Sequence, residues 1–239
     1  MEGTILTLGG GGFSMSGRKS PLDDHLLALT GDRRPRVCFV PTAGGDERDY
    51  MEYFQDCFHG RAETHVLSLF GRVDSKIRNL TSDPNRVLDM DVVYVGGGST
   101  ANLLAVWRLH GMPGLLEKAA AQGTILAGQS AGMNCWFEES NSDSFGPLSP
   151  LPDGLGFLPG SACPHYDGEP ERRPSYLRMV ESGDLQGGHA AHDHCALLWR
   201  DGELVEALSE RRGAHAFRVT RDDGRAHEEP IPARFLGAT

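Results

Sequence analysis

Residues 124–132 read TILAGQSAG, and this stretch decides the fold that the sequence predicts. Residues 124–127 form a short apolar run of the kind found in central parallel strands. Gly128, Ser130 and Gly132 complete the pattern G-x-S-x-G, which is typical of a nucleophile elbow between a strand and a helix. Glycines on both sides leave room for a strained turn and for close helix–strand packing. The stretch therefore predicts a serine hydrolase, and the alternative is an ordinary turn in which Ser130 only caps the helix.

Strand-like and helix-like segments alternate before this stretch. Strands are expected over residues 4–8, 36–40, 63–67 and 92–95, and helices over residues 22–29, 47–57, 101–109 and 114–121. This alternation predicts an α/β fold with a mostly parallel sheet flanked by helices. From about Cys195, short apolar runs separated by turn residues predict a C-terminal antiparallel portion. Because no linker or repeat interrupts the chain, we expect a single domain over residues 1–239.

Composition excludes several classes of function. The 239 residues are 39% hydrophobic and 23% charged, as in ordinary globular proteins. The net charge of −10 and the lack of a basic run argue against a nucleic-acid partner. No apolar stretch approaches the roughly 18 residues of a membrane span, and residues 1–13 do not form a signal peptide. Five scattered cysteines without a CxxC pair suggest buried free thiols in a reducing cytoplasm.

A serine nucleophile needs a base, and the base needs an orienting acid. His165 is the best base among the histidines, because it follows the strand-like residues 161–164 and opens a polar loop. Asp193 is attractive as the acid because it lies just before the apolar run 195–199. The sequence does not choose between it and the other carboxylates that could serve, which are Asp143, Asp167 and Glu169.

An oxyanion hole requires two backbone amides that point at the reacting oxygen. The amide of Ala131, directly after the serine, is expected to be one of them. The second is expected from Gly98 or Gly97 in the glycine turn that follows residues 92–95. The run Gly9–Gly12 is a rival for this role, because it also follows a predicted strand.

A histidine-rich segment raises the question of a metal. His189, His192 and His194 surround Asp193 with the spacing H-x₂-H-x-H. This spacing lacks the helical logic of H-E-x-x-H zinc sites, and no second set of ligands follows. The sequence therefore predicts neither a metal nor another cofactor.

Three segments taken together resemble the peptidase E (aspartyl dipeptidase) family, which is related to the cyanophycinases. They are YVGGGSTANLL (94–104), AGQSAG (127–132) and the stretch from Asp143 to Arg173 that contains PHY, and the resemblance spans roughly residues 1–210. It implies a fold similar to class I glutamine amidotransferases, with serine in place of their cysteine. It also implies that Ser130 is the nucleophile and His165 the base.

The resemblance extends to the acid of the triad. Asp193 matches an acidic position of the family, with His194 standing where glycine is usual, and Asp143 resembles a second acidic position. The resulting order Ser, His, Asp differs from that of α/β-hydrolases, although Ser130, Asp193 and His215 would satisfy the latter.

The implied activity is hydrolysis of short peptides, often with a preference for an amino-terminal aspartate. Such a preference needs a cation. Glu171 stands where aspartyl dipeptidases carry arginine, and would favour a substrate amine or a basic side chain. The resemblance also suggests a homodimer. Alternatives are a cyanophycinase-like β-aspartyl peptide hydrolase, an esterase or amidase of α/β-hydrolase type, and a non-enzymatic binding protein. Substrate contacts are expected from Gly97, Tyr166, Asp167, Glu171, Arg172 and Arg173.

Overall fold

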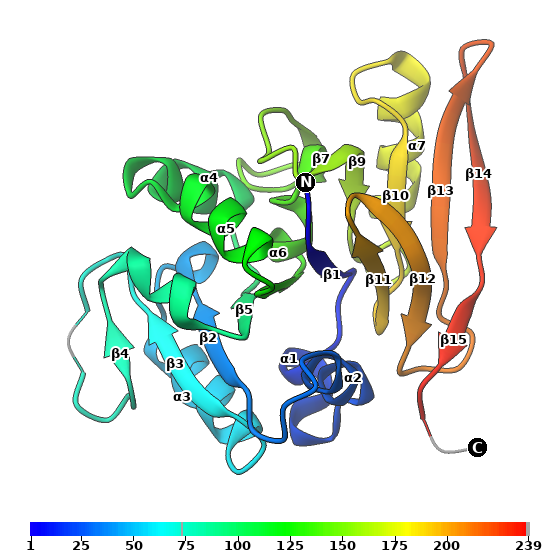
Figure 1. The fold of residues 1–239 in the computed structure, drawn as a ribbon. Helices are drawn as coiled ribbons and strands as arrows, with labels where there is room; N and C mark the ends of the chain where they lie inside the picture. Colours follow the sequence, from blue (N-terminus) through cyan, green and yellow to red (C-terminus); the bar gives the residue numbers. More distant parts are fainter. Residues whose placement is uncertain (73, 238–239) are drawn as a thin grey trace.

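The computed structural model describes residues 1–72 and 74–237, and its centre is a sheet that has nine strands within this part of the chain. The strand order is β15-β12-β11-β1-β6-β5-β2-β3-β4 (Figure 1). Neighbours from β1 to β4 run parallel, whereas β11 is antiparallel to both β1 and β12. The strands are β1 Thr4–Leu8, β2 Arg36–Val40, β3 Glu63–Leu67, β4 Leu80–Thr81, β5 Val92–Val95, β6 Ile125–Gln129, β11 Cys195–Arg200, β12 Glu203–Ser209 and β15 Ala233–Phe235.

Helices cover both faces of this sheet, because its central strands are apolar on both sides (Figure 1). On one face, Trp107 of α4 and Leu116 of α5 belong to a core cluster with sheet residues such as Val93. On the other face, Leu26 of α2 and Phe54 of α3 do the same with Phe39. The α-helices are α1 Phe13–Ser16, α2 Pro21–Leu29, α3 Arg48–Phe58, α4 Thr100–Leu109, α5 Met112–Ala121, α6 Ala131–Asn134 and α7 Arg172–Ser182. Short 3₁₀ turns occupy Gly17–Lys19, Thr42–Gly44 and Pro84–Asp89.

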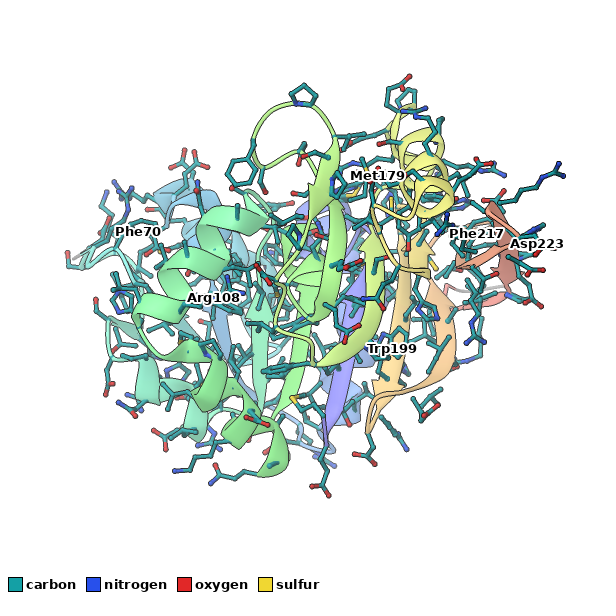
Figure 2. All side chains as sticks on the ribbon, turned by 90° about the horizontal axis from the view of Figure 1, so that it is seen from above. Phe70, Arg108, Met179, Trp199, Phe217 and Asp223 are labelled. Atoms are coloured by element: carbon teal, nitrogen blue, oxygen red, sulfur yellow. The ribbon has the colours of Figure 1, made fainter. Side chains whose placement is uncertain are left out.

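A second sheet packs beside the first, with the order β14-β13-β10-β9-β7-β8. Its strands are β7 Phe137–Ser142, β8 Ser149–Leu151, β9 Leu158–Cys163, β10 Gly188–Ala191, β13 Ala216–Asp222 and β14 Arg225–Ile231. Trp199 of β11 packs edge-on against Phe137 of β7 and His189 of β10, and so joins the two sheets. Figure 2 labels Trp199 together with Met179 of α7 and Phe217 of β13, both of which lie on the side of the second sheet.

The predicted fold class is confirmed. The strands expected over residues 4–8, 36–40, 63–67 and 92–95 are present with the same bounds. The sequence did not anticipate that the strands after Cys195 are shared between two sheets, with β13 and β14 in the second. All five cysteines are buried free thiols, as expected. Within residues 1–72 and 74–237, no helix is long and apolar enough to cross a membrane.

Asp23, in the first turn of α2, is a fully buried carboxyl group. Burial raises its pKa to about 8, and the charge of Glu210 adds to this, against the opposing charge of Arg61. Among the described residues, neither carboxyl oxygen has a hydrogen-bond partner. Asp23 is therefore protonated at neutral pH in the folded protein.

This burial predicts a pH-dependent stability. In the unfolded chain the carboxyl of Asp23 titrates near pH 4, whereas in the folded chain its pKa is about 8. Its contribution to stability is therefore complete below about pH 4 and is lost as the pH rises to about 8. Asp23→Asn should exceed the wild type in free energy of unfolding by on the order of a few kcal/mol at pH 8, and by little at pH 4.5. Urea unfolding at both values tests this, and an equal difference at the two would contradict it.

Candidate active site

Ser130 sits in a strained turn between β6 and α6. Its backbone angles are φ 55° and ψ −114°, a left-handed conformation that is uncommon for residues other than glycine. Its side chain makes no capping hydrogen bond to α6. Ser130 thus occupies the N-cap position of α6 without capping the helix through its side chain, and its backbone has the strain expected of a nucleophile elbow.

The two glycines of the motif are required by close packing. A Cβ atom on Gly128 would overlap the carbonyl oxygen of Gly132, and one on Gly132 would overlap the carbonyl oxygen of Val95. Helix α6 thus lies directly against β5 and β6. The glycines let the serine follow the strand without a break in the packing.

Three loops converge on the end of β1. The amides of Ser130, His165 and His194 donate to the consecutive carbonyl groups of residues 8–10, at 3.1, 3.0 and 3.0 Å. All three residues have positive φ angles, of 55°, 54° and 64°. The glycine-rich end of β1 is therefore the frame on which these residues are assembled, and each of the three has a strained backbone.

His165 and Asp193 form a direct pair. The Nδ1 atom of His165 donates to Oδ1 of Asp193 at 2.7 Å, and both side chains are largely buried. A Cβ atom on Gly10 or on Gly168 would overlap the Asp193 carboxylate. Since neither glycine has a positive φ, the absence of a side chain at these two positions serves to make room for the acid.

No hydrogen bond joins the Ser130 hydroxyl to the His165 ring within the described part of the chain. Such contacts are often long in free enzymes and shorten when the substrate binds. Because Nδ1 of His165 is engaged by Asp193, Nε2 is the atom left to accept a proton from a hydroxyl.

The other candidate acids have different partners. Asp143 forms an ion pair with Arg172 at 3.1 Å, and Glu169 binds the same guanidinium. Asp167 accepts a hydrogen bond from the Asp193 amide at 2.8 Å and pairs with Arg211. Burial raises the pKa of Asp167, but the hydrogen bonds from Arg211 and from the Asp193 amide outweigh it, so this pKa is below its ordinary value.

The glycine turn after β5 borders the serine. A Cβ atom on Gly97 would lie 3.3 Å from Cβ of Ser130. The Gly97 amide donates to the Tyr50 hydroxyl, which also accepts a hydrogen bond from the side chain of Gln129. The amide of Gly98 has no intramolecular partner among the described residues.

The amide of Ala131 and the rival run Gly9–Gly12 also bear on the expected oxyanion hole. Ala131 is the first residue of α6, so no carbonyl of that helix can accept its amide. In the rival run, the amides of Gly9, Gly11 and Gly12 donate to Cys195, Met15 and Glu210. These three amides are thus occupied, whereas the amide of Gly10 in the same run, like that of Gly98, has no intramolecular partner among the described residues.

The residues of the loop after His165 differ in their burial and in their partners. Tyr166 is buried and donates its hydroxyl to Glu228, which also pairs with Arg173. Arg172 is buried and donates to the Asn141 carbonyl. Glu171, in contrast, is exposed and lines a pocket together with Asp143, Glu169 and Arg178.

The histidines around Asp193 face separate surroundings. His189 packs against Trp199, and His192 accepts a hydrogen bond from the His215 amide. His194 binds Glu210 at 2.9 Å. The described residues contain no group of three or more acidic, histidine or cysteine side chains with the geometry of a metal site.

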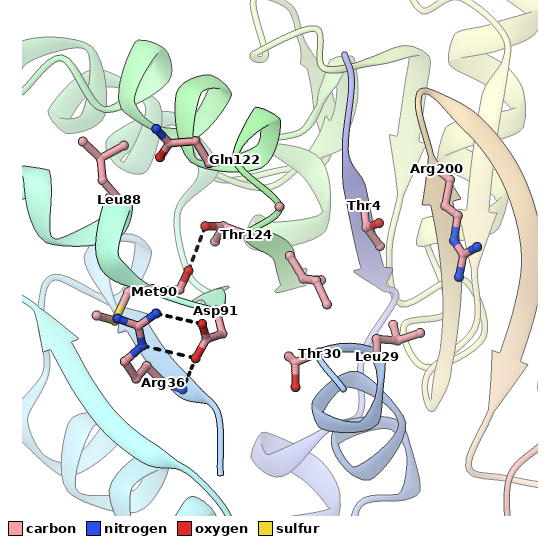
Figure 3. Close-up of a pocket in the computed structure, with 12 residues that line it drawn as sticks. Thr4, Leu29, Thr30, Arg36, Leu88, Met90, Asp91, Gln122, Thr124 and Arg200 are labelled. Atoms are coloured by element: carbon pink, nitrogen blue, oxygen red, sulfur yellow. Dashed lines mark hydrogen bonds and ion pairs between the residues drawn. The ribbon is translucent and has the colours of Figure 1, made fainter. Parts of the chain in front are cut away.

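A polar cleft at the opposite end of the main sheet is separate from this site (Figure 3). Thr4, Arg36 and Thr124 line it, at the amino ends of β1, β2 and β6. In open α/β sheets, sites form at the carboxyl ends of the strands, where Ser130 lies.

Two residues near the site were not predicted from the sequence. Arg211 contacts Asp167 and the carbonyl of Asp193, and Glu210 accepts from the amide of Gly12 and from His194. Both follow β12 and belong to no recognisable motif, so the sequence offered no local signal for them.

Comparisons with known proteins identify the family of this chain. The profile of peptidase family S51 matches residues 5–207. An uncharacterised peptidase of Bacillus subtilis, YgaJ, is 43% identical over 235 residues, which cover 98% of this chain and 99% of that protein. A peptidase E from a Shewanella species is 28% identical over 177 residues, which cover 70% and 72% of the two chains.

A solved structure has the same fold. The crystal structure of a putative peptidase E protein from Listeria monocytogenes matches with a TM-score of 0.64 at 18% identity. The match covers 87% of this chain and 99% of that one.

Proposed function

The chain belongs to peptidase family S51 and is a serine peptidase of the peptidase E type, and from that premise we propose that it hydrolyses short peptides through a triad of Ser130, His165 and Asp193. The observation that carries the proposal is the 2.7 Å hydrogen bond between His165 and Asp193, beside a strained serine on the same strand end. We also propose a cytoplasmic location, in keeping with five buried free thiols.

The proposed reaction follows from which atoms are free. Nε2 of His165 takes the proton of the Ser130 hydroxyl, and the serine oxygen attacks the peptide carbonyl carbon. The amides of Ala131 and Gly98 bind the oxyanion of the tetrahedral intermediate. His165 then protonates the leaving amine, and the C–N bond breaks to give an acyl-enzyme. His165 then takes a proton from water, whose oxygen attacks the acyl carbon; the ester C–O bond to Ser130 breaks, the acid product leaves, and His165 returns the proton to the serine oxygen.

The proposed substrates are dipeptides and short peptides. Glu171 is exposed beside Asp143 and Glu169, so this pocket carries three carboxylates against Arg178 and the buried Arg172. Opposite charges attract at such a surface. An amino group or a basic side chain therefore suits this pocket better than an aspartate.

A peptide panel with a serine-reactive probe tests the proposal. The panel contains Asp-Xaa, basic-Xaa and β-aspartyl dipeptides and the matching tripeptides, with Ser130→Ala as the background. We expect turnover of short peptides and labelling of Ser130 by a fluorophosphonate. Labelling without peptide turnover would shift the assignment to an esterase or amidase. Neither turnover nor labelling would indicate a binding protein.

A further inference from the structure

The turn that carries Asp193 is held by an ion pair from two other segments. Oδ1 of Asp167 accepts from the Asp193 amide at 2.8 Å. Nη2 of Arg211 donates to the Asp193 carbonyl oxygen at 3.1 Å, and the same nitrogen pairs with Oδ2 of Asp167. The peptide groups on both sides of Asp193 are therefore bound to one pair of charges.

The neighbouring residues of the turn have their own anchors. The amide of His192 donates to the His215 carbonyl at 3.0 Å, and that of His194 to the Gly10 carbonyl at 3.0 Å. The His194 amide belongs to the same planar peptide as the Asp193 carbonyl, and the His192 carbonyl, in the same peptide as the Asp193 amide, accepts from the Cys195 amide at 3.2 Å. Asp167 and Arg211 therefore add a second anchor to each of the two peptides that flank Asp193. Without this second pair of anchors, the Asp193 backbone has more freedom to rotate and to carry its carboxylate away from His165.

We propose that Arg211 and Asp167 are positioning residues that fix the backbone of Asp193 and thereby keep its carboxylate on His165. This inference rests on the proposed triad. It gives Asp167 a role different from the substrate contact that the sequence suggested. Arg211 lies outside residues 5–207, the part matched by the family profile.

The ion pair is suited to positioning more than to stabilising the fold. The side chains of Arg211 and Asp167 are 46% and 28% exposed, and pairs at this exposure contribute little to stability. A displacement of about 1 Å in a catalytic group, in contrast, can slow a reaction on the order of 10²-fold. The two effects can therefore be separated by experiment.

The test compares Arg211→Gln and Asp167→Asn with Arg212→Gln. Arg212 is the neighbouring arginine, is exposed, and stacks over Phe235 at 4.5 Å. We expect Arg211→Gln to lower kcat roughly 10- to 100-fold with little change in KM or melting temperature. Arg212→Gln should behave as the wild type. Arg211→Lys should recover only part of the loss, because one ammonium cannot reproduce the planar guanidinium.

A second readout needs no substrate. The Nδ1 proton resonance of His165 reports the hydrogen bond to Asp193, and we expect it to broaden by exchange in Arg211→Gln and to stay sharp in Arg212→Gln. The double variant that combines Arg211→Gln with Asp167→Asn should lose little more activity than Arg211→Gln alone, since Arg211 and Asp167 act through one contact. If the wild type hydrolysed no peptide, the proposed function would fail, and the resonance would still decide the positioning role.

Three results would overturn the inference. A rise in KM at constant kcat would assign Asp167 or Arg211 to substrate binding. A loss of activity that followed only the melting temperature would assign them to stability. An unchanged resonance in both Arg211→Gln and Asp167→Asn would show that Asp193 holds its place without them.

Discussion

Replacing Ser130 with alanine is expected to slow peptide hydrolysis roughly 10⁴- to 10⁶-fold, because it removes the nucleophile of the proposed triad. The change removes only the Oγ atom of Ser130 and adds no larger group. The strained turn at φ 55° and the packing of α6 should therefore persist. Initial rates on the best substrate of the peptide panel measure the loss. Circular dichroism and the melting temperature check that the fold is retained.

The double variant that combines Ser130→Ala with His165→Ala tests this prediction further. If the two residues act as one catalytic unit, the double variant should be about as slow as Ser130→Ala alone. Additive losses would mean that His165 contributes by another route. Retention of more than a tenth of the wild-type rate in Ser130→Ala would remove Ser130 from the mechanism.

Asp193→Asn is expected to lower kcat on the order of 10³- to 10⁴-fold. The carboxylate accepts the Nδ1 proton of His165 and leaves Nε2 free as the base. An asparagine amide of the same shape can instead donate to Nδ1, which favours the tautomer that carries its proton on Nε2 and cannot accept another. Steady-state kinetics on the same peptide measure the effect.

Asp143→Asn is the matched comparison for this prediction. Asp143 pairs with Arg172, which keeps Glu169 and the Asn141 carbonyl as further partners. We therefore expect Asp143→Asn to change kcat less than tenfold, since Asp143 makes no contact with His165 among the described residues. If Asp143→Asn lowered kcat more than Asp193→Asn, Asp143 would be the acid of the triad.

The sequence was sufficient to predict most of the main sheet, although not β4, because most of its strands carry their own signal. Residues 36–40 and 92–95 are short apolar runs bounded by turns, and such runs are typical of strands buried on both faces. The second sheet carries such a signal only in part, as in the strand-like residues 161–164 that overlap β9. Strand β7 reads FEESNS and β8 reads SPL, so their pairing depends on neighbours that are distant in sequence.

The residues of the candidate site also differ in whether the local sequence indicates them. Ser130 lies in a local motif whose glycines are explained by contacts within a few residues and with the next strand. His165 could be selected because it follows a strand-like run. Arg211 could not, because its partner Asp167 is 44 positions away and an arginine after a strand is ordinary. The space that Gly10 and Gly168 leave for Asp193 also exists only in the folded chain.

The order of pairing along β1 has a consequence for biosynthesis. β1 is made before one of its neighbours, β11, which lies about 190 residues later in the chain. Pairings over such distances form slowly, because a long loop must close first. On the ribosome, the elbow with Ser130 emerges well before the turn with Asp193 and the arginine that binds it. A nascent chain would therefore hold the proposed triad incomplete until the turn with Asp193 had been synthesised.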